Sequence, residues 1–353
     1  MRNFLLFFVL ILIIFIRYVS TKPNYIDGQK VRITGKITTV PIKYPSAQRI
    51  EIAGLKTFLP PFPEVFYGDK IIIEGTVEKG SLKNPKLLQR VEGKSFLEGL
   101  RGKLISFYQK TLPEPHASLV SGIVLGAKSS LPLDFWESLK KTGTAHVVVA
   151  SGMNVTFVAG FLIAAFSLFL PRRRAIPFVL AGIIFYCAIA SFEAPIVRAG
   201  IMGALVFLAQ ETGRVASGFR VLTISALIML IFRPDWIGDL GFILSFVATA
   251  SLMVFQKRIE IKLKKFPNLI RQDLSTTLAA QIGVTPILFV TFGYFNLFSP
   301  FINALILWTV PLIMIIGAAS GLIGFLFPSL GGLILYLVYP LTWWFSAVVR
   351  ILG

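Results

Sequence analysis

The segment TGTAHVVVASGMNVTFVAGFLIAAFSLFL, residues 142–170, determines how the rest of the chain is interpreted. After Gly143 it is apolar for more than the roughly 20 residues that cross about 30 Å of hydrocarbon. His146, Ser151 and Asn154 nevertheless lie near its beginning, in a chain that has only two histidines. Polar side chains are costly inside a bilayer and usually face a water-filled path or a neighbouring helix. We therefore expect a membrane span whose first turns are polar for one of these two reasons.

The composition extends this expectation to most of the chain. Of 353 residues, 55% are apolar and only 15% are charged, which is not the composition of a soluble globule. We predict a polytopic α-helical membrane protein. Its transmembrane part is expected over residues 143–353, with about eight spans near 144–170, 175–192, 195–210, 217–232, 238–255, 274–293, 300–326 and 328–349.

Charges in the predicted loops give an orientation. The loops 171–175, 211–220 and 256–272 together contain eleven Lys and Arg residues, whereas the alternate loops contain only Arg233. Basic loops remain in the cytoplasm, so these three loops and the N-terminus are predicted to be cytoplasmic. Much of the formal net charge of +18 therefore follows from topology.

The N-terminal segment, residues 1–20, has an apolar run between Arg2 and Arg17 and lacks the small residues of a signal-peptide cleavage site. We predict a retained membrane anchor. Residues 21–95 then alternate apolar and polar side chains in stretches such as VRITGKITTV (31–40) and DKIIIEGTVEK (69–79). Short strands containing glycine predict a small, closed or partly closed β-barrel, which the topology places outside the cell.

Lys and Arg outnumber Asp and Glu in this β segment, and aromatic residues are interleaved among them: Tyr25, Tyr44, Phe58, Phe62, Phe66 and Tyr67. A basic surface with exposed aromatic rings is typical of single-stranded nucleic acid binding. The alternative is that the aromatic side chains fill the barrel core.

Residues 96–142 are predicted to form amphipathic helices at the membrane interface, because Phe96, Leu100 and Leu104 share one helical face. Within this region GIVLGAKSS (122–130) is similar to a phosphate-binding loop. It lacks the required glycine before the lysine, since Ala127 occupies that place, and no nucleotide site is expected.

The opening segment, TGTAHVVVASGMNV, resembles the signature of the ComEC family, competence proteins that carry DNA across the bacterial inner membrane. Three later segments are similar to motifs of the same family in the same order: APIVRAG (194–200), RPDWIGDLGFILSF (233–246) and QIGVTPILFVTFGYFNLFSPFINALILWTVPL (281–312). The β segment resembles the external OB-type domain of that family. One departure is Asn154, which stands where the family pattern has a second histidine.

The resemblance implies a DNA path, and it selects the residues predicted to line it: Thr142, Gly143, His146, Ser151, Gly152, Asn154, Arg198, Asp239, Gln281 and Asn303. Arg198 is also singled out by physical chemistry, because a guanidinium within an apolar span either binds an anion or forms an ion pair. The phosphates of a passing strand would be that anion. Glu193 and Asp239 are the carboxylates available for the alternative, an internal ion pair.

The function predicted from these features is a channel for uptake of single-stranded DNA across the bacterial cytoplasmic membrane during natural transformation. We expect no catalytic activity, metal or cofactor. The expected partners are single-stranded DNA, membrane lipid, a cytoplasmic ATP-driven motor, an external DNA receptor and a separate nuclease. Longer family members end in a metallo-hydrolase domain, whereas His116 and His146 are the only histidines here.

Two other functions are considered. A transporter or flippase for another anionic polymer or lipid fits the same composition. An intramembrane hydrolase would use Ser151 and His146, but five residues of separation place these side chains on different faces of a regular helix.

Overall fold

The computed structural model describes residues 2–21, 25–37, 41–44, 46–91, 93, 96–127, 131–148, 151–293, 296 and 298–353. These residues form two compact units, Met1–Lys103 and Leu104–Gly353, which are described separately. Thr39, in the quoted stretch 31–40, lies outside the described residues, and so do residues 128–130 of the quoted stretch 122–130.

The first unit begins with the helix α1 (Arg2–Thr21), which covers the predicted anchor. Ile11, Leu12, Phe15 and Ile16 are exposed on it. Exposed apolar side chains at this density are stable when lipid surrounds them. The helix therefore has the surface that the predicted anchor requires.

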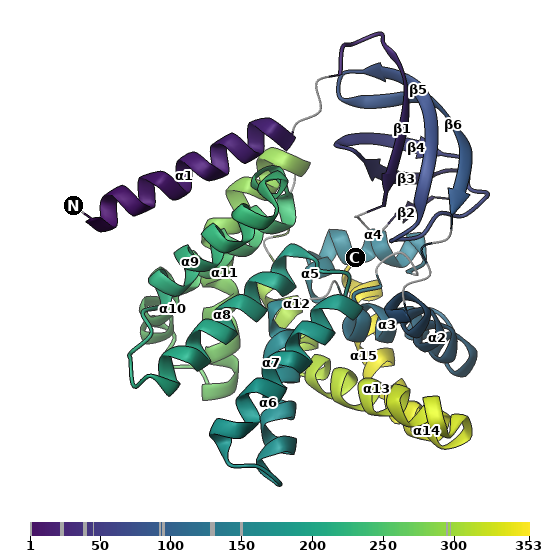
Figure 1. The fold of residues 1–353 in the computed structure, drawn as a ribbon. Coiled ribbons are helices and arrows are strands. Elements are labelled where there is room, and N and C mark those ends of the chain that lie inside the picture. The colour runs from purple at the N-terminus through teal and green to yellow at the C-terminus, as the bar shows by residue number, and fades with distance from the viewer. Residues whose placement is uncertain are drawn as a thin grey trace. The chain divides into compact units, whose positions relative to one another are not determined.

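The predicted β segment forms a six-stranded sheet, curved in Figure 1, with the strand order β1-β5-β6-β4-β3-β2. Neighbouring strands are antiparallel except for the parallel pair β4–β6. The strands are β1 (Lys30–Lys36), β2 (Ile42–Lys43), β3 (Gln48–Ile52), β4 (Leu55–Leu59), β5 (Lys70–Glu78) and β6 (Ser81–Val91).

Alternation along these strands produces one apolar core. In β5 the side chains of Ile71, Ile73 and Val77 are buried, and the residues between them face outward. The same pattern in β3 and β4 buries a matching set, and the core consists of Ile33, Ile37, Ile50, Ile52, Leu55, Leu59, Val65, Ile71, Ile73, Val77 and Leu82. The predicted period-two strands are thus present. Of the six aromatic residues singled out in the sequence, Tyr25 is partly buried against this core, and none of the six belongs to the fully buried set.

A glycine allows the sheet to bend. The β5–β6 register is irregular between Glu74 and Thr76, on either side of Gly75. A Cβ atom on Gly75 would lie 2.7 Å from Leu82 Cγ and 2.8 Å from the carbonyl oxygen of Lys83. Only glycine fits such a close approach of two strands, as expected for strands that curve strongly.

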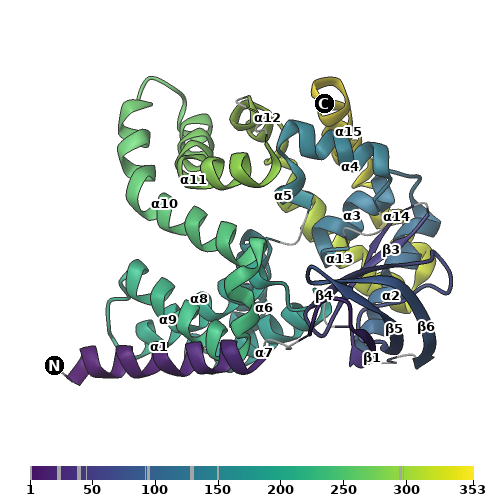
Figure 2. The ribbon, with the colours of Figure 1, turned by 90° about the horizontal axis from the view of Figure 1, so that it is seen from above.

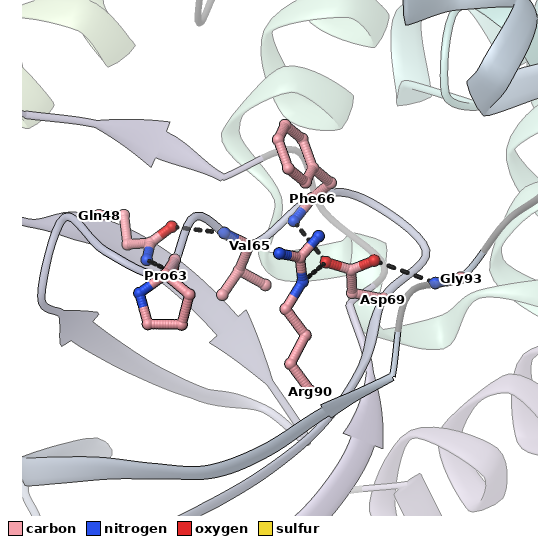
Figure 3. Close-up of polar contacts among 7 residues, drawn as sticks. All are labelled: Gln48, Pro63, Val65, Phe66, Asp69, Arg90 and Gly93. Atoms are coloured by element: carbon pink, nitrogen blue, oxygen red, sulfur yellow. Dashed lines mark hydrogen bonds and ion pairs between the residues drawn. The ribbon is translucent and has the colours of Figure 1, made fainter.

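A buried carboxylate closes the turn before β5 (Figure 3). Asp69 accepts hydrogen bonds from the backbone N–H groups of Phe66 (2.9 Å) and Gly93 (3.0 Å), and its Oδ2 pairs with Arg90 Nε at 2.7 Å. The Asp69 side chain is only 4% exposed. Because a buried charge is tolerated only when it is paired and hydrogen-bonded, this one residue joins the start of β5 to the end of β6.

The second unit is helical. Its elements are the last part of α2 (Phe96–Thr111), then α3 (His116–Leu125), α4 (Leu133–Thr142), α5 (Ala145–Val148), α6 (Gly152–Ser167), α7 (Arg172–Ile189), α8 (Ala194–Glu211), α9 (Gly218–Phe232), the 3-10 helix η2 (Pro234–Gly238), α10 (Leu240–Lys262), α11 (Asn268–Phe292), α12 (Ser299–Ile306), α13 (Thr309–Leu326), α14 (Pro328–Tyr336) and α15 (Tyr339–Leu352). α10 and α11 form a long hairpin (Figure 2).

Five stretches of the described chain are long and apolar enough to cross a membrane, and a sixth results if α14 and α15, bent by 47°, count as one span. The five are Ala145–Ser167, Ala194–Glu211, Leu240–Lys262, Arg271–Thr291 and Thr309–Leu326. This differs from the eight spans expected. α9 has only 15 residues, and the expected span 300–326 is divided into α12 and α13.

The region predicted to be interfacial differs from expectation in α3. Every residue of α3 is buried, so this helix is part of the core of its unit rather than an amphipathic surface helix. Gly122 explains the close packing, because a Cβ there would lie 2.6 Å from Val148 Cγ1. Gly122, the first glycine of the stretch that is similar to a phosphate-binding loop, thus has a packing role. This fits helix association through small residues.

Replacing Asp69 tests the turn network. Asp69→Ala leaves Arg90 and two backbone N–H groups without their acceptor, so we expect a loss of about 3 kcal/mol in the stability of the β unit. Thermal unfolding of the purified full-length protein, followed by limited proteolysis of the β unit, measures this. The exposed Glu51→Ala is the matched control. Equal midpoints for both variants would show that the network contributes nothing.

Candidate functional site

The turn between α4 and α5 is built on Thr142 and Gly143. Thr142 is fully buried, and its hydroxyl donates to the carbonyl of Ser138 at 2.8 Å. Gly143 ends α4 in the left-handed conformation, with φ of 72°. A Cβ at Gly143 would also lie 2.7 Å from Ser299 Oγ. Glycine is therefore required here both for the backbone conformation and for the contact with α12.

A group of polar side chains surrounds this turn. His146 Nδ1 lies 3.0 Å from the carbonyl oxygen of Gly143, and its imidazole is exposed. Ser299 Oγ lies 3.4 Å from the same oxygen, and Asn303 Nδ2 donates to Ser299 Oγ at 3.3 Å. Asn303 Oδ1 is buried and has no hydrogen-bond partner among the described residues. Thr142, Gly143, His146 and Asn303 thus form one polar group, which we call the turn group.

Asn154 has a different environment. It is fully buried, its Nδ2 donates to the carbonyl oxygen of Ile123 at 2.8 Å, and its Oδ1 accepts from Ser151 Oγ at 3.2 Å. Ile123 lies in the last turn of α3, where carbonyl groups lack partners within the helix. Of the two roles considered for Asn154, this geometry favours a hydrogen bond between helices.

Gly152 brings the beginning of α6 against α8. A Cβ at Gly152 would lie 3.0 Å from Arg198 Nη2 and 3.2 Å from the Cβ of Ala199. The segments 151–154 and 194–200 therefore contact each other, although about forty residues of chain separate them. Any side chain at Gly152 would occupy the space beside the guanidinium.

Arg198 is held by hydroxyl groups of α10. Its Nε donates to Ser245 Oγ at 2.7 Å, and its Nη1 donates to Thr249 Oγ1 and to Met202 Sδ, the latter at 3.6 Å. The Phe246 ring lies 6.0 Å from the guanidinium carbon. Within the described part of the chain, no carboxylate lies within ion-pairing distance of Arg198, and its Nη2 makes no hydrogen bond. The ion pair with Glu193 or Asp239 that the sequence left open is thus not formed.

Asp239 has a separate task at the beginning of α10. Its Oδ1 accepts a hydrogen bond from the backbone N–H of Phe242 at 2.7 Å, which makes it the N-cap of that helix. A carboxylate at this position satisfies a free N–H and interacts favourably with the helix dipole. Asp239 therefore fixes the start of the helix that carries Ser245 and Thr249, and it does not contact Arg198.

Gln281 contacts neither the turn group nor Arg198. It is half-buried in α11 and has no hydrogen bond to another described residue. α11 packs on α10 two residues further on, where a Cβ at Gly283 would lie 2.1 Å from Ser251 Oγ. Sequence reasoning in turn missed Ser245, Thr249 and Ser299. The signal for the first two was present, because hydroxyls four residues apart lie on one face of a helix.

The β unit presents a second candidate surface on β3 and β4. The rings of Tyr44 and Phe58 lie 6.2 Å apart, and Arg49 is opposite Phe58 in the β3–β4 ladder. Phe58 and Tyr44 are 55% and 40% exposed, and Lys56 is exposed on the same strand face as Phe58. This face therefore carries aromatic rings between cationic side chains.

One acidic residue on the surface of the sheet, Glu74, is paired with a lysine. Lys30 Nζ lies 2.7 Å from Glu74 Oε1, and this hydrogen bond with its charge lowers the pKa of Glu74 below the ordinary value. Glu74 remains ionised and paired at neutral pH. Both groups are solvent-exposed, so the pair adds little stability.

A family model described as "Competence protein" matches residues 123–353, which contain both polar groups of the helical unit. The chain belongs to the competence protein family.

Individual relatives of this competence-family protein have low sequence identity to it, between 26% and 31%. It is 26% identical to the ComE operon protein 3 of Bacillus subtilis over 227 residues, which are 64% of this chain and 28% of the relative. It is 31% identical to the competence protein ComA of Neisseria gonorrhoeae over 144 residues, 38% of this chain and 21% of that protein. An uncharacterized protein of Escherichia coli, YcaI, is 28% identical over 234 residues, 61% and 31% of the two chains.

The match covers less than a third of the length of these curated relatives. No solved structure matches the chain. Family membership and the apolar helices together establish that this is a membrane protein.

The contact between Gly152 and Arg198 can be tested with two glycines of the same helix. Gly152→Leu forces a side chain into the α6–α8 contact, and we expect a loss of about 1–3 kcal/mol in stability. Gly160→Leu is the control, because a Cβ at Gly160 has no atom within 4 Å. Thermal unfolding in detergent compares the two. A Gly152→Leu protein as stable as Gly160→Leu would contradict the close contact.

Proposed function

We propose that this protein acts in DNA uptake during natural transformation, as a channel that passes single-stranded DNA through the bacterial cytoplasmic membrane. The observation that carries the proposal is Arg198, a guanidinium among apolar helices without a carboxylate partner in the described chain. Membership of the competence family supports DNA uptake as the process. Competence is the capacity of bacteria to take up DNA, and two of the relatives are named for it.

Arg198 has the properties of a contact for a moving phosphate. Ser245 and Thr249 hold the guanidinium in place, so it is preorganised without being neutralised. Its Nη2 edge remains for a phosphate oxygen, beside Gly152. An ion pair would compete with that phosphate, whereas neutral hydroxyls do not. A single fixed positive charge also binds each phosphate weakly enough to release it.

The remaining predicted residues have two proposed roles: some line the polar route, and others hold its helices in place. We assign Thr142, Gly143, His146, Ser151, Gly152, Gln281 and Asn303 to the polar route. His146 is exposed, and Asn303 Oδ1 is an unused acceptor that water would satisfy. Asn154 and Asp239 support the route by holding α6 to α3 and by starting α10.

The β unit is proposed to be an external OB-like domain that receives the strand. In an OB barrel the first strand bends to pair at both edges, and the third and fifth strands are parallel. The sheet order supports this arrangement if β1 and β2 are the two halves of the first strand and β4 and β6 are the parallel pair. The ligand face of OB folds is then β3–β4, where Tyr44, Phe58 and Arg49 lie.

The proposed topology anchors the chain through α1 and places the β unit outside. The turn between α10 and α11 would be cytoplasmic, with Lys264 and Lys265 exposed on it and Lys257, Arg258 and Lys262 exposed near the end of α10. Basic loops are retained on the cytoplasmic side. A cytoplasmic ATP-driven motor is proposed to dock there. An external DNA receptor delivers the substrate, and a separate nuclease removes the second strand.

The geometry gives less support to the alternatives. Ser151 Oγ donates to Asn154, and His146 is hydrogen-bonded to Gly143, so the two do not form the nucleophile–base pair of a hydrolase. A transporter or flippase for another anionic polymer or lipid uses the same Arg198 chemistry. Family membership favours DNA over these substrates.

Arg198→Ala tests the proposed route. We expect loss of transformation by at least about 100-fold, since removing a preorganised charge in a low-dielectric site costs about 3 kcal/mol. Protein in the membrane fraction should stay at the wild-type level. Arg214→Ala, in an exposed loop, is the control and should transform normally. Normal uptake of labelled DNA by the Arg198→Ala strain would remove this residue from the path.

Salt dependence tests the β unit. The isolated segment 23–95 and the purified full-length protein should both bind single-stranded DNA, with affinity falling as salt rises because phosphate contacts release counterions. Fluorescence anisotropy with a labelled 20-nucleotide strand measures this. Arg49→Gln should reduce the slope of log Kd against log salt by about 0.7. Absence of binding at low salt would make the β unit a spacer.

A further inference from the structure

The β unit contains a hollow of about 410 Å³ at the edge of its apolar core, which contributes Leu59 to the lining, and neither Tyr44 nor Phe58 lines it. Its walls come from the end of β4, the following loop and the middle of β6. The lining residues are Gln48, Leu59, Pro60, Phe62, Pro63, Pro85, Lys86, Leu87 and Leu88. The volume is within the range of pockets that hold small organic ligands, which begins at about 300 Å³.

The hollow exists because β4 and β6 separate. Their parallel ladder contains only the pairs Lys56–Ser81 and Thr57–Leu82. Beyond these pairs Asn84 has a φ of 49°, and Pro85 follows without an N–H group. Proline removes a ladder hydrogen bond, so β6 leaves β4 at this point and a wedge remains between the two strands.

Gln48 lines this wedge, and Figure 3 shows its hydrogen bonds to Pro63 and Val65. Its Nε2 donates to the carbonyl oxygens of Pro60 (2.8 Å) and Pro63 (2.7 Å), and its Oε1 accepts from the N–H of Val65 at 2.9 Å. Both amide hydrogens are therefore used. The amide holds the 60–65 loop as a fixed wall, and it offers no donor to a ligand.

The walls are carbon surfaces. Phe62 is 75% exposed and Leu88 is 46% exposed, although both are apolar and both line the hollow. Two prolines, Pro63 and Pro85, complete these walls. Such a site buries the faces of a flat ring and does not read the hydrogen-bonding pattern at its edges.

One cation lies in the lining, and no carboxylate does. Lys86 is opposite Glu74 in the β5–β6 ladder, but Glu74 is engaged by Lys30 at 2.7 Å. Lys83, also exposed, precedes Lys86 on the same strand. A ligand that combines a flat ring with a negative charge is therefore the chemical match.

We propose that this hollow binds one nucleobase of single-stranded DNA, with the ring against Phe62 and an adjoining phosphate on Lys86. The assignment rests on the proposed function, in which the β unit receives the strand. Because the Gln48 amide has no free donor and the Lys86 ammonium is used by the phosphate, the base edge is not read and the site accepts every base. It would therefore hold a strand of any sequence.

Two DNA ligands of equal charge, one with bases and one without, distinguish base binding from phosphate binding. The full-length protein in detergent is titrated with a labelled 20-mer of thymidine and with a 20-unit abasic strand that has the same phosphates. We expect the thymidine strand to bind about tenfold more tightly, in line with one well-stacked base.

Substitutions in the lining test whether the preference for the thymidine strand arises in the hollow. Phe62→Ser should reduce the preference to about twofold or less, with abasic binding unchanged, because the exposed ring contributes stacking only. Lys86→Gln should weaken both strands and reduce the salt slope. Phe96→Ser is the matched control, since Phe96 is 80% exposed and lies outside the lining.

The outcomes distinguish this inference from the function on which it rests. If neither strand binds at low salt, the proposed role of the β unit fails and the nucleobase site fails with it. If both strands bind the wild type equally, or if Phe62→Ser keeps the full preference, the nucleobase site is overturned while DNA binding stands. A polyproline peptide that binds the wild type but not Phe62→Ser, without any base preference, would assign the hollow to a protein partner instead.

Discussion

The membrane part of this protein depends on placing one guanidinium among apolar helices without neutralising it. A free charge of this kind is expensive in lipid, and proteins normally pair it with a carboxylate. Here the hydroxyls of Ser245 and Thr249 take that place, and both are supplied by the same face of α10. The cost of burial is reduced by hydrogen bonding, and the positive charge has no carboxylate partner among the described residues.

Several other features follow from this arrangement. α10 has to begin at a defined point for its hydroxyls to reach Arg198, and Asp239 determines that point as an N-cap. α6 has to approach α8 closely, and Gly152 permits the approach. Asn154 then fixes α6 from its other side by its bond to the end of α3. Polar residues that resemble a row of channel-lining groups in the sequence are thus partly structural supports.

The surface of the β unit also carries side chains that are usually buried, in this case aromatic rings. Of the aromatic residues singled out in the sequence, Tyr25 packs against its core, whereas Tyr44, Phe58 and Phe62 remain exposed to different extents. Exposed rings beside cationic side chains are suited to bases and phosphates together. The bend of β6 at Asn84 and Pro85 adds a wedge that a regular ladder would have closed.

The amino-acid sequence by itself determined the class of protein, because apolar runs and period-two strands record directly which residues belong to apolar helices or to the core of a sheet. It also singled out Arg198, since an intramembrane guanidinium has few roles, and Thr142, Gly143 and Gly152 through the motif that resembles the family signature. It did not reveal that α3 is buried on all sides or that the span 300–326 is broken, because both depend on which helices pack nearby. Nor did it separate Asp239 and Asn154 from the residues beside the guanidinium. Only the tertiary structure decided that, because a polar side chain has the same identity whether it caps a helix, joins two helices or faces an open path, and its neighbours come from distant parts of the chain.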